Sequence, residues 1–563
     1  MEDGKVGEYS TVGDMRMDLF TSQVIRSSLH YASEEMGIAL RNSAYSPNIK
    51  ERMDHSAALF DDQGRMLAQA EHIPVHLGSL PWGILNTIDY LRRGNVDLER
   101  ETMIVVNNPY VAGTHLNDVT VIRPIFHGFR LIGYAANKAH HSDVGGKVPG
   151  SISSDARSIY EEGFIIDPIL LMKKNRFVDD IVSLFSLNSR NPYERTGDIK
   201  AQVAANFTGE RRVIELVEKY GLENYSEATS ELYDYSRRVA VSRIQKMKKG
   251  VFKAQDFIES PDGDSSVLKV SIKVNDDSIK INYSGTSSQL DIPLNAVLGV
   301  TISGAFYVFK CIMGEDIPVN YGTFLPLEID VPVGTILNPK FPAPVAGGNV
   351  ETSQRNADLL FLALSKSISD VVPAASGGSM NNIMVGGEYR GKPWAFYETI
   401  GVGLGGRKDM DGVDGVHANM TNTMNTPIEE IEKNLPMDIV RYEFREDSSG
   451  AGTFRGGSGL VRAYRIREGK VTLTVLADRG LHSPWGLMGG MEGAKTSVSI
   501  ISGKEIDKVG TKGTFQLSKG DTFQIETAGG GGFGNPKKRR KELLELDLKN
   551  NLISKGYAEK LYL

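Results

Sequence analysis

The sequence contains a single cysteine, Cys311, among its 563 residues. One cysteine excludes an intrachain disulfide and any thiolate cluster for zinc or iron–sulfur. Its apolar surroundings, FYVFKCIM, predict a buried structural thiol. No stretch approaches the ~18 uninterrupted apolar residues of a membrane span. The first ten residues, MEDGKVGEYS, lack the apolar segment of a secretory signal. We therefore expect a cytoplasmic protein without a membrane partner.

Positive charge is not in excess: 64 Lys and Arg stand against 70 Asp and Glu, a formal net charge of −6. Nucleic-acid binding needs a basic face that displaces counterions from phosphates, so we expect no nucleic-acid partner. The one basic run, residues 537–540, precedes ELLELDLKNNL at helical spacing. This pattern predicts a solvated helix at the C-terminal end of the sequence.

Nucleotide-binding and nucleophile motifs are missing as well. GVGLGG (401–406) satisfies G-x-G-x-x-G, but RKDMDGVDG follows it and cannot form the helix that would hold a pyrophosphate. GGMEGAKTS (489–497) and TAGGGGFGNP (527–536) both miss the P-loop pattern, and no G-x-S-x-G elbow occurs. The 60 glycines exceed a background of ~7% and form dispersed clusters. They predict tight turns and close backbone approaches rather than phosphate sites.

What the sequence does contain is a mixture of helical and strand patterns over several domains. The length exceeds one hydrophobic core, since domains usually hold ~100–200 residues. The pattern predicts a multi-domain α+β fold with mixed N-terminal and central regions and a β-rich C-terminal portion. The expected parts are an N-terminal α+β domain carrying the His/Asp loops (1–255), a central α+β domain (256–437), a β-rich domain (438–536) and a helical tail (537–563).

Hydrophobic periodicity and turn residues place the main elements. Hairpins are expected at 55–69, around DDQG, and at 268–285, around Asn275–Asp277. The remaining expected elements are strands at 103–106, 119–122 and 131–141, and helices at 14–47, 193–249 with a break at Gly221, 295–313 and 354–368.

Histidine is concentrated in one part of the chain. Seven of the ten histidines lie between positions 55 and 141: His55, His72, His76, His115, His127, His140 and His141. Histidine and aspartate without thiolates suit Zn, Mn or Fe(II) in a catalytic site rather than a structural one.

Two short loops each offer a histidine and an aspartate. In GTHLNDV, His115 and Asp118 are three residues apart and can share one side of a turn. In AHHSDVGG, strand alternation lets His141 and Asp143 face one way and His140 the other. Together the loops can supply three or four ligands and leave a coordination position for water. Which of the two adjacent histidines binds is left open.

The alternative interpretation is that each histidine is an ordinary loop residue with a hydrogen-bond partner. For any single histidine that interpretation is the better one, and only the combination of both loops favours a metal. His72 and His76 in EHIPVHLG are four residues apart, but Pro74 argues against a helical ligand pair. We expect them to line the same cleft as supporting groups.

Longer stretches of the sequence together resemble the hydantoinase B/oxoprolinase family, from about residue 15 to the end. This family includes the B subunit of N-methylhydantoinase, the C-terminal half of 5-oxoprolinase and the α subunit of acetone carboxylase. The matching stretches include ERMDHSAALFDDQGRMLAQAEHIPVHLGSLP (51–81), NNPYVAGTHLNDVTVIRPIF (107–126), NKAHHSDVGGKVPGS (137–151), IYEEGFIIDPI (159–169), DGVDGVHANMTNTMNTPIE (411–429) and DSSGAGTFRGGSGLVR (447–462).

The resemblance implies a partner and a chemistry. Family members act with a second subunit, or a fused N-terminal half, of actin-like fold that binds ATP and Mg. They use ATP to open a cyclic amide or to carboxylate a ketone. In the carboxylases the subunit like this one holds a divalent metal, here Zn or Mn and alternatively Fe. The carried-over ligand candidates are His115, Asp118, His140 or His141, and Asp143.

The resemblance also implies candidate catalytic residues. Asp54, Glu161 and Glu162 are candidate general bases by family position, and His72 and His76 are candidates beside them. For each carboxylate the alternative is a solvated or salt-bridged side chain. Asn419 in HANMTNT departs from relatives that have a second histidine there, so no role is carried over to it.

Three functional hypotheses follow. The first is the metal-bearing B-type subunit of an ATP-dependent cyclic-amide hydrolase of the hydantoinase or 5-oxoprolinase type, working as a hetero-oligomer with the ATP-binding subunit. The second is the α-type subunit of an ATP-dependent ketone carboxylase. The third is a non-catalytic scaffold subunit.

Overall fold

The computed structural model describes residues 19–70, 72–94, 96 and 98–563. Residues 1–18, which hold the segment without a secretory-signal pattern and the start of the helix expected at 14–47, lie outside the described residues. The strands within the described ranges form four sheets, and the helices lie mainly against the first two. The multi-domain α+β class is therefore confirmed. None of the helices in this part of the chain is long and apolar enough to span a bilayer.

The first sheet is antiparallel and has the strand order β2-β1-β5-β4-β3-β6-β7. Its strands are β1 (His55–Asp61), β2 (Met66–Gln69), β3 (Met103–Val106), β4 (Asp118–His127), β5 (Arg130–His140), β6 (Ile169–Lys173) and β7 (Arg176–Phe177). The expected hairpin at 55–69 is confirmed, with Gly64 at φ 76° in its turn. The three strands expected between 103 and 141 are also present.

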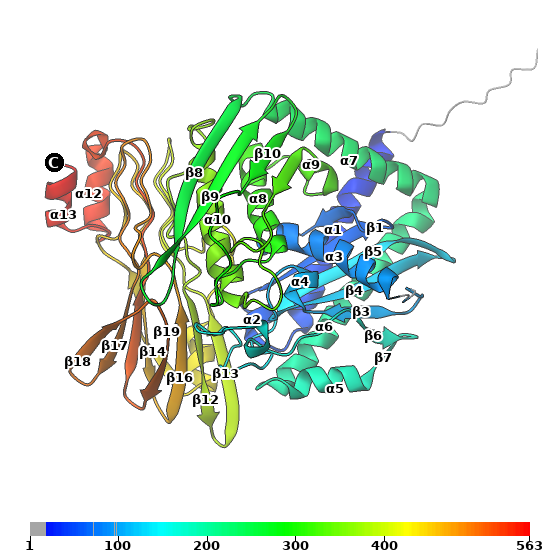
Figure 1. Ribbon diagram of the computed structural model, residues 1–563, viewed down its shortest axis with the longest axis horizontal. Coiled ribbons are helices and arrows are strands. Elements are labelled where there is room, and N and C mark those ends of the chain that lie inside the picture. The colour runs from blue at the N-terminus through cyan, green and yellow to red at the C-terminus, as the bar shows by residue number, and fades with distance from the viewer. Residues whose placement is uncertain (1–18, 71, 95, 97) are drawn as a thin grey trace, which may run out of the picture.

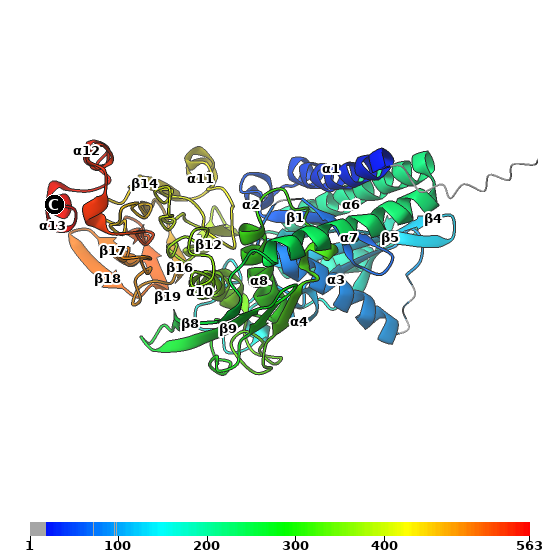
Figure 2. The ribbon, with the colours of Figure 1, turned by 90° about the horizontal axis from the view of Figure 1, so that it is seen from above.

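Helices cover both faces of this sheet (Figure 2). On one face lie α1 (Leu19–Ser43), α2 (Pro47–Lys50), α6 (Pro192–Tyr220) and α7 (Leu222–Ile244), and on the other α3 (His76–Arg93), α4 (Pro109–Ala112) and α8 (Leu298–Met313). Strand β1 is therefore buried on both faces. Ala57 and Leu59 join the core under α1, whereas Ala58 and Phe60 join the core under α3. The helical region expected at 193–249 is confirmed, with its break at Gly221.

The second sheet has the order β11-β10-β9-β8 and shares one hydrophobic core with the first. Its strands are β8 (Gly250–Glu259), β9 (Ser265–Val274), β10 (Ile279–Asn282) and β11 (Leu327–Asp330). Helix α10 (Ser353–Leu364) packs between this sheet and α8, and a π-helical turn, η2 (Gly348–Thr352), leads into it. The hairpin expected at 268–285 and the helices expected at 295–313 and 354–368 are confirmed.

The other two sheets form the β-rich end of the molecule (Figure 1). One has the order β13-β12-β16-β19 and the other the order β14-β15-β20-β17-β18. Their strands are β12 (Asn382–Tyr389), β13 (Lys392–Glu398), β14 (Met437–Phe444), β15 (Leu460–Ile466), β16 (Lys470–Leu476), β17 (Ser497–Ser502), β18 (Glu505–Val509), β19 (Lys512–Ser518) and β20 (Thr522–Glu526). The remaining elements are η1 (Ile159–Glu161), α5 (Asp179–Leu187), α9 (Tyr321–Phe324), α11 (Ile428–Asn434), η3 (Pro536–Lys538), α12 (Lys541–Lys549) and α13 (Lys555–Leu561).

The glycine-rich segments pack backbone against backbone. A Cβ atom on Gly403 would lie 1.8 Å from the carbonyl oxygen of Gly457, and one on Gly530 would lie 1.9 Å from that of Leu404. Backbone hydrogen bonds join the same segments, such as the one from the amide of Gly457 to the carbonyl of Leu404, 2.7 Å long. The glycines of 401–406 therefore serve close backbone packing.

Two expectations from the sequence are wrong. Residues 537–540 do not begin the C-terminal helix, since α12 starts at Lys541 and the buried Arg539 pairs with Asp411 and Asp547. Cys311 is exposed. It lies in the last turn of α8 beside a cavity, whereas the core-facing side of that helix is made by Val308, Phe309 and Met313.

Candidate metal centre

The end of the first sheet brings two histidines and one aspartate together. Strand β4 begins at Asp118, strand β5 ends at His140, and these two residues are direct partners in the antiparallel ladder. His115 stands in the turn before β4, where the amide of Asp118 donates to the carbonyl of His115 over 3.1 Å. The sequence thus places all three side chains at one end of neighbouring strands.

One ligand atom from each of His115, Asp118 and His140 lies within 4.8 Å of the others. All three side chains are buried, and Nε2 of His115 is 3.4 Å from Oδ2 of Asp118. Both ring nitrogens of His115, Nε2 of His140 and Oδ2 of Asp118 have no hydrogen-bond partner among the described residues. Buried polar atoms are normally paired, so these converging atoms point to a ligand. Two imidazoles and a carboxylate are a donor set that fits a divalent cation.

The side chains around His140 fix its orientation. Oδ2 of Asp54 is 3.3 Å from Nδ1 of His140, which leaves Nε2 facing the other two ligand candidates. The ring of Tyr397 stacks on His140 with 4.5 Å between the ring centroids, and the guanidinium of Arg52 lies over Tyr397. A carboxylate behind a ligating histidine is a common arrangement in metal sites because it sets the tautomer and raises basicity.

The electrostatics favour the ligating protonation states of Asp118 and His140. Burial alone would raise the pKa of Asp118, but His115 and His76 outweigh it and hold this pKa well below its ordinary value. Burial lowers the pKa of His140, against the opposite effect of Asp54, so the imidazole is neutral at physiological pH. For Asp54, burial is outweighed by His140 and then Arg52, and the net effect lowers the pKa of Asp54.

Of the two predicted supporting histidines, His76 contacts the triad and His72 does not. Nε2 of His76 is 3.4 Å from Oδ2 of Asp118, and Nδ1 of His76 is 2.9 Å from the hydroxyl of Ser56. His72 stacks edge-on against His55 and lies 3.9 Å from Glu34. His76 begins α3 whereas His72 precedes it in a loop, so the two are not a helical pair, as Pro74 predicts.

The chain matches known proteins over nearly its whole length. A family model described as hydantoinase B/oxoprolinase matches residues 18–536. The chain belongs to this family. It is 49% identical to an uncharacterised protein of Methanocaldococcus jannaschii, over 96% of this chain and 94% of the other. It is 32% identical to a Pseudomonas protein named as the B component of a D-/L-hydantoinase, over 96% and 94% of the two chains.

The eukaryotic family members that match are longer. 5-Oxoprolinase 1 of Arabidopsis thaliana is 35% identical over 89% of this chain but only 41% of its own length. The chain therefore spans about two fifths of the 5-oxoprolinases it matches.

Two solved structures share the fold of this family member. The ATP-dependent caprolactamase of Pseudomonas jessenii superposes with a TM-score of 0.89 at 26% identity, over 97% of this chain and 96% of the other. Acetone carboxylase superposes with a TM-score of 0.91 at 18% identity, over 97% and 79% of the two chains. At 18% identity, the similarity to acetone carboxylase shows a shared fold only.

The other predicted ligand candidates of this hydantoinase B/oxoprolinase chain lie apart from the triad. Nε2 of His141 is 3.0 Å from the side-chain oxygen of Gln202 on α6, and its ring packs against Phe185 on α5. Asp143 accepts hydrogen bonds from the amides of Gly145, Gly150 and Arg190, and from the guanidinium of Arg190. In this geometry both residues hold the loop after β5 in place.

The candidate general bases Glu161 and Glu162 are bonded to residues outside the triad. Glu161 pairs with Lys147 over 3.1 Å near the surface. Glu162 is buried and accepts hydrogen bonds from the amides of Val345 and Ala346, and burial raises the pKa of Glu162 to about 8. Neither is grouped with the triad in the part of the chain that the structure describes.

Sequence reasoning missed Arg52 and Tyr397. No spacing signal links Tyr397 to His140, because the two residues meet only through packing of distant segments. His417 is a third omission. It lies close enough to Arg52 and Asp54 for their charges to act on its pKa, and it also lines a cavity.

Proposed function

We propose that this chain is the metal-bearing B-type subunit of an ATP-dependent cyclic-amide hydrolase of the hydantoinase or 5-oxoprolinase type. The observation that carries the proposal is the buried triad of His115, Asp118 and His140, whose converging atoms lack partners among the described residues. Membership of the hydantoinase B/oxoprolinase family and the 26% identity to an ATP-dependent caprolactamase support the reaction type.

The triad residues would hold a divalent ion, Zn or Mn and alternatively Fe, since mixed histidine and carboxylate ligation suits all three. When bound, such an ion supplies Lewis-acid chemistry, lowering the pKa of water towards neutral and polarising a carbonyl. Three protein ligands leave coordination positions free for water and substrate.

The surrounding residues have separate roles in this proposal. Asp54 positions His140 by accepting a hydrogen bond from its Nδ1–H, so that Nε2 is presented to the ion. His76 contacts Asp118 through Nε2 and is the nearest imidazole outside the triad able to hold or pass a proton. His72, with His55, lies behind it in the same histidine cluster.

ATP chemistry belongs to a partner subunit in this account. An amide is a poor electrophile, and phosphorylation of its oxygen with ATP makes its carbon open to attack. The glycine-rich segments of this chain pack against one another's backbone and so offer no phosphate cradle among the described residues. We therefore propose an actin-like, ATP- and Mg-binding A-type subunit as the partner in a hetero-oligomer.

The test is ATP hydrolysis by the complex reconstituted from this chain and its partner. We expect ADP release that depends on a cyclic amide such as hydantoin, 5-oxoproline or ε-caprolactam, and that proceeds without bicarbonate. A strict requirement for bicarbonate and a ketone would reject the hydrolase in favour of the carboxylase. Full activity in a metal-free complex would reject the metal-bearing role and favour a scaffold.

A further inference from the structure

The ligand candidate His140 is held from several sides by the residues that surround it. Its carbonyl accepts a hydrogen bond from the side chain of Asn48 over 2.7 Å, and its amide donates to the carbonyl of Asp54 over 3.0 Å. One face of its ring stacks on Tyr397. Arg52 contacts both Asn48 and Tyr397, so these two supports of His140 are joined through a single side chain.

Arg52 is fully buried, and its guanidinium makes five hydrogen bonds, as many as an arginine has N–H groups. Each bond ends on a neutral oxygen. The acceptors are the side chains of Asn48, Thr399 and Thr423 and the carbonyls of Tyr397 and Met424. A lysine could not replace this arrangement, because its three N–H groups share one nitrogen.

The charge of Arg52 has no direct counterpart. Arg52 forms no ion pair with another described residue, whereas Arg355, which is equally buried, pairs with Asp478. A buried charge normally needs a partner of opposite sign, so ion pairing does not explain why an arginine stands here. The five hydrogen bonds do, because they fix the positions of the groups that they join.

These bonds join three segments that are far apart in the sequence. The first is α2, which lies against β5, the strand that ends at His140. The second is the end of β13, and the third is the loop before α11. Met424 in this loop also donates from its amide to the carbonyl of Arg52 over 3.1 Å, so the two residues are bonded in both directions. Arg52 thus connects the strand of His140 with the β-rich end of the molecule.

The backbone beside Arg52 has an unusual conformation. Met53 has a φ of 56°, in the left-handed region that a bulky residue rarely adopts. On its two sides, Asp54 faces Nδ1 of His140 directly, while Arg52 reaches His140 through intermediate side chains. Such a conformation persists only where the surrounding structure requires it, often at functional sites.

We propose that Arg52 is a positioning residue of the metal centre, whose guanidinium fixes His140 by holding Asn48 on its carbonyl and Tyr397 against its ring. This inference rests on the proposed function. It makes the affinity of the metal centre depend on contacts between the first sheet and the β-rich end of the molecule.

The test measures the dissociation constants of Zn²⁺ and Mn²⁺ on the purified full chain by competition with a chelator. Arg52→Lys keeps the positive charge but loses the geometry of the five bonds. Loss of a supporting group behind a metal ligand typically weakens metal affinity about 10–100-fold, and we expect a loss within this range. Unchanged dissociation constants in folded Arg52→Lys would overturn the proposal.

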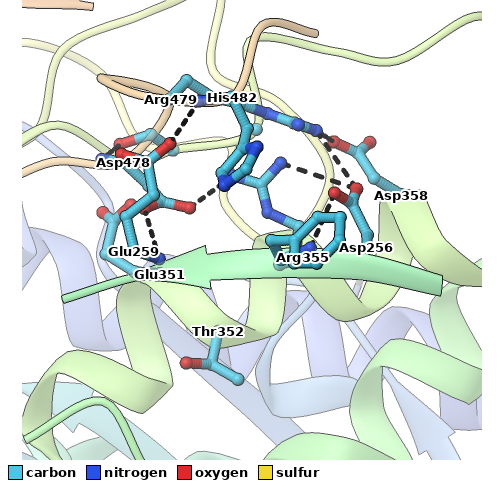
Figure 3. A network of polar contacts seen from close by, with 12 residues as sticks. Asp256, Glu259, Glu351, Thr352, Arg355, Asp358, Asp478, Arg479 and His482 are labelled. Atoms are coloured by element: carbon cyan, nitrogen blue, oxygen red, sulfur yellow. Dashed lines mark hydrogen bonds and ion pairs between the residues drawn. The ribbon is translucent and has the colours of Figure 1, made fainter. Parts of the chain in front are cut away.

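Arg355→Lys is the matched control for the loss of a buried guanidinium. Arg355 lies in a separate cluster of buried charges (Figure 3). We expect both variants to lower the melting temperature and only Arg52→Lys to weaken metal binding. Equal weakening in the two variants would assign the effect to general destabilisation and would overturn the positioning role.

Variants of the intermediate residues test the route. Asn48→Ala removes the bond to the carbonyl of His140, and Tyr397→Leu removes the stacked ring. Each should weaken metal binding. Adding Arg52→Lys to the double variant should cost about twofold or less, because both contacts with His140 are already gone. The full further loss in that background would overturn the route.

A milder variant decides the matter if Arg52→Lys does not fold. Thr399→Val removes one of the five hydrogen bonds and leaves Arg52 in place. We expect it to weaken metal binding about threefold, in keeping with the loss of one hydrogen bond. Unchanged metal binding in Thr399→Val would then overturn the proposal.

A second measurement separates this inference from the proposed function. Crystal structures of metal-free wild type and Arg52→Lys show whether the ring of His140 stays stacked on Tyr397. We expect it to be displaced in Arg52→Lys only. A displaced ring, in a chain whose wild type binds no divalent ion, would keep the positioning role and reject the proposed function. A ring that stays in place would overturn the positioning role, whether or not the chain binds metal.

Discussion

The metal centre and the ion network beneath α10 are both buried, yet their polar atoms are used differently. At the metal centre, acceptor atoms of His115, Asp118 and His140 converge without a hydrogen bond among the described residues. In the ion network, the carboxylates of Asp256, Asp358 and Asp478 meet Arg355, Arg479 and Lys512 (Figure 3).

The difference separates a site from a structural element. Opposite charges that pair with each other need no ligand, so the network joins α10 to β8, to β19 and to the loop that follows β16. At the metal centre two imidazoles and a carboxylate converge within 4.8 Å, a donor set that a divalent cation would satisfy. Burial and a missing hydrogen bond therefore do not mark a functional site by themselves, since Oδ2 of Asp256 and Nε of Arg355 in the ion network also lack one. The converging donor set of the metal centre is what distinguishes it.

The largest expected effect is the loss of the metal centre. His115→Ala removes one of three ligands, so we expect it to lose stoichiometric metal and to reduce amide-dependent ATP hydrolysis by the complex to background. His127→Ala, at the exposed end of the same strand β4, is the control and should keep both. Normal activity in metal-free His115→Ala would show that the triad is structural.

Breaking the ion network is expected to act on stability instead. Arg355→Met leaves Asp478 and Asp256 without this partner in the interior. Removing one member of a buried ion pair costs about 3–5 kcal/mol, so the free energy of unfolding, measured by denaturant titration, should fall by that amount. Metal content per folded chain should not change. A stable variant that lacks metal would break the distinction between the two clusters.

A smaller effect is expected behind the triad. Asp54→Asn keeps the shape of the side chain but removes the charge that positions His140. Loss of such a supporting carboxylate typically weakens metal affinity about 10–100-fold, which competition with a chelator measures. If affinity is unchanged, the orientation of His140 must depend on Tyr397 rather than on Asp54.

The smallest expected effect concerns acid stability. The pKa of His417 is about 3 in the folded chain, below the ordinary value of 6.5. Between these values the unfolded chain binds a proton that the folded chain does not, so stability falls as pH falls from 6.5 towards 3. The melting temperature of His417→Gln should therefore fall less than that of wild type between pH 6.5 and 4.5. Parallel curves for the two proteins would contradict this assignment.

Local features of the fold are predictable from the sequence. Gly64 predicts the turn between β1 and β2, and Gly221 the break between α6 and α7, because both positions have positive φ angles. The start of the C-terminal helix α12 at Lys541 is not predictable in this way. Arg539 precedes the helix because it forms buried ion pairs with Asp411 and Asp547, and local sequence does not reveal these pairs. The division into four domains stays a prediction.

The candidate site is predictable in part. The loops GTHLNDV and AHHSDVGG identify the residues, but the choice between His140 and His141 depends on the pairing of β4 with β5. Alternation along one strand cannot make this choice, since both faces of the sheet are covered by helices. Tyr397 and His417 come from distant segments, and only tertiary packing brings them near the triad.

The most direct test of the metal centre is anomalous diffraction from crystals of the full chain, with metal content determined on the same preparation. We predict one divalent ion per chain, with its anomalous peak between Nε2 of His140, Oδ2 of Asp118 and the ring of His115. A metal-free chain after incubation with Zn, Mn and Fe(II), or a peak at His141 and Asp143 instead, would contradict the account.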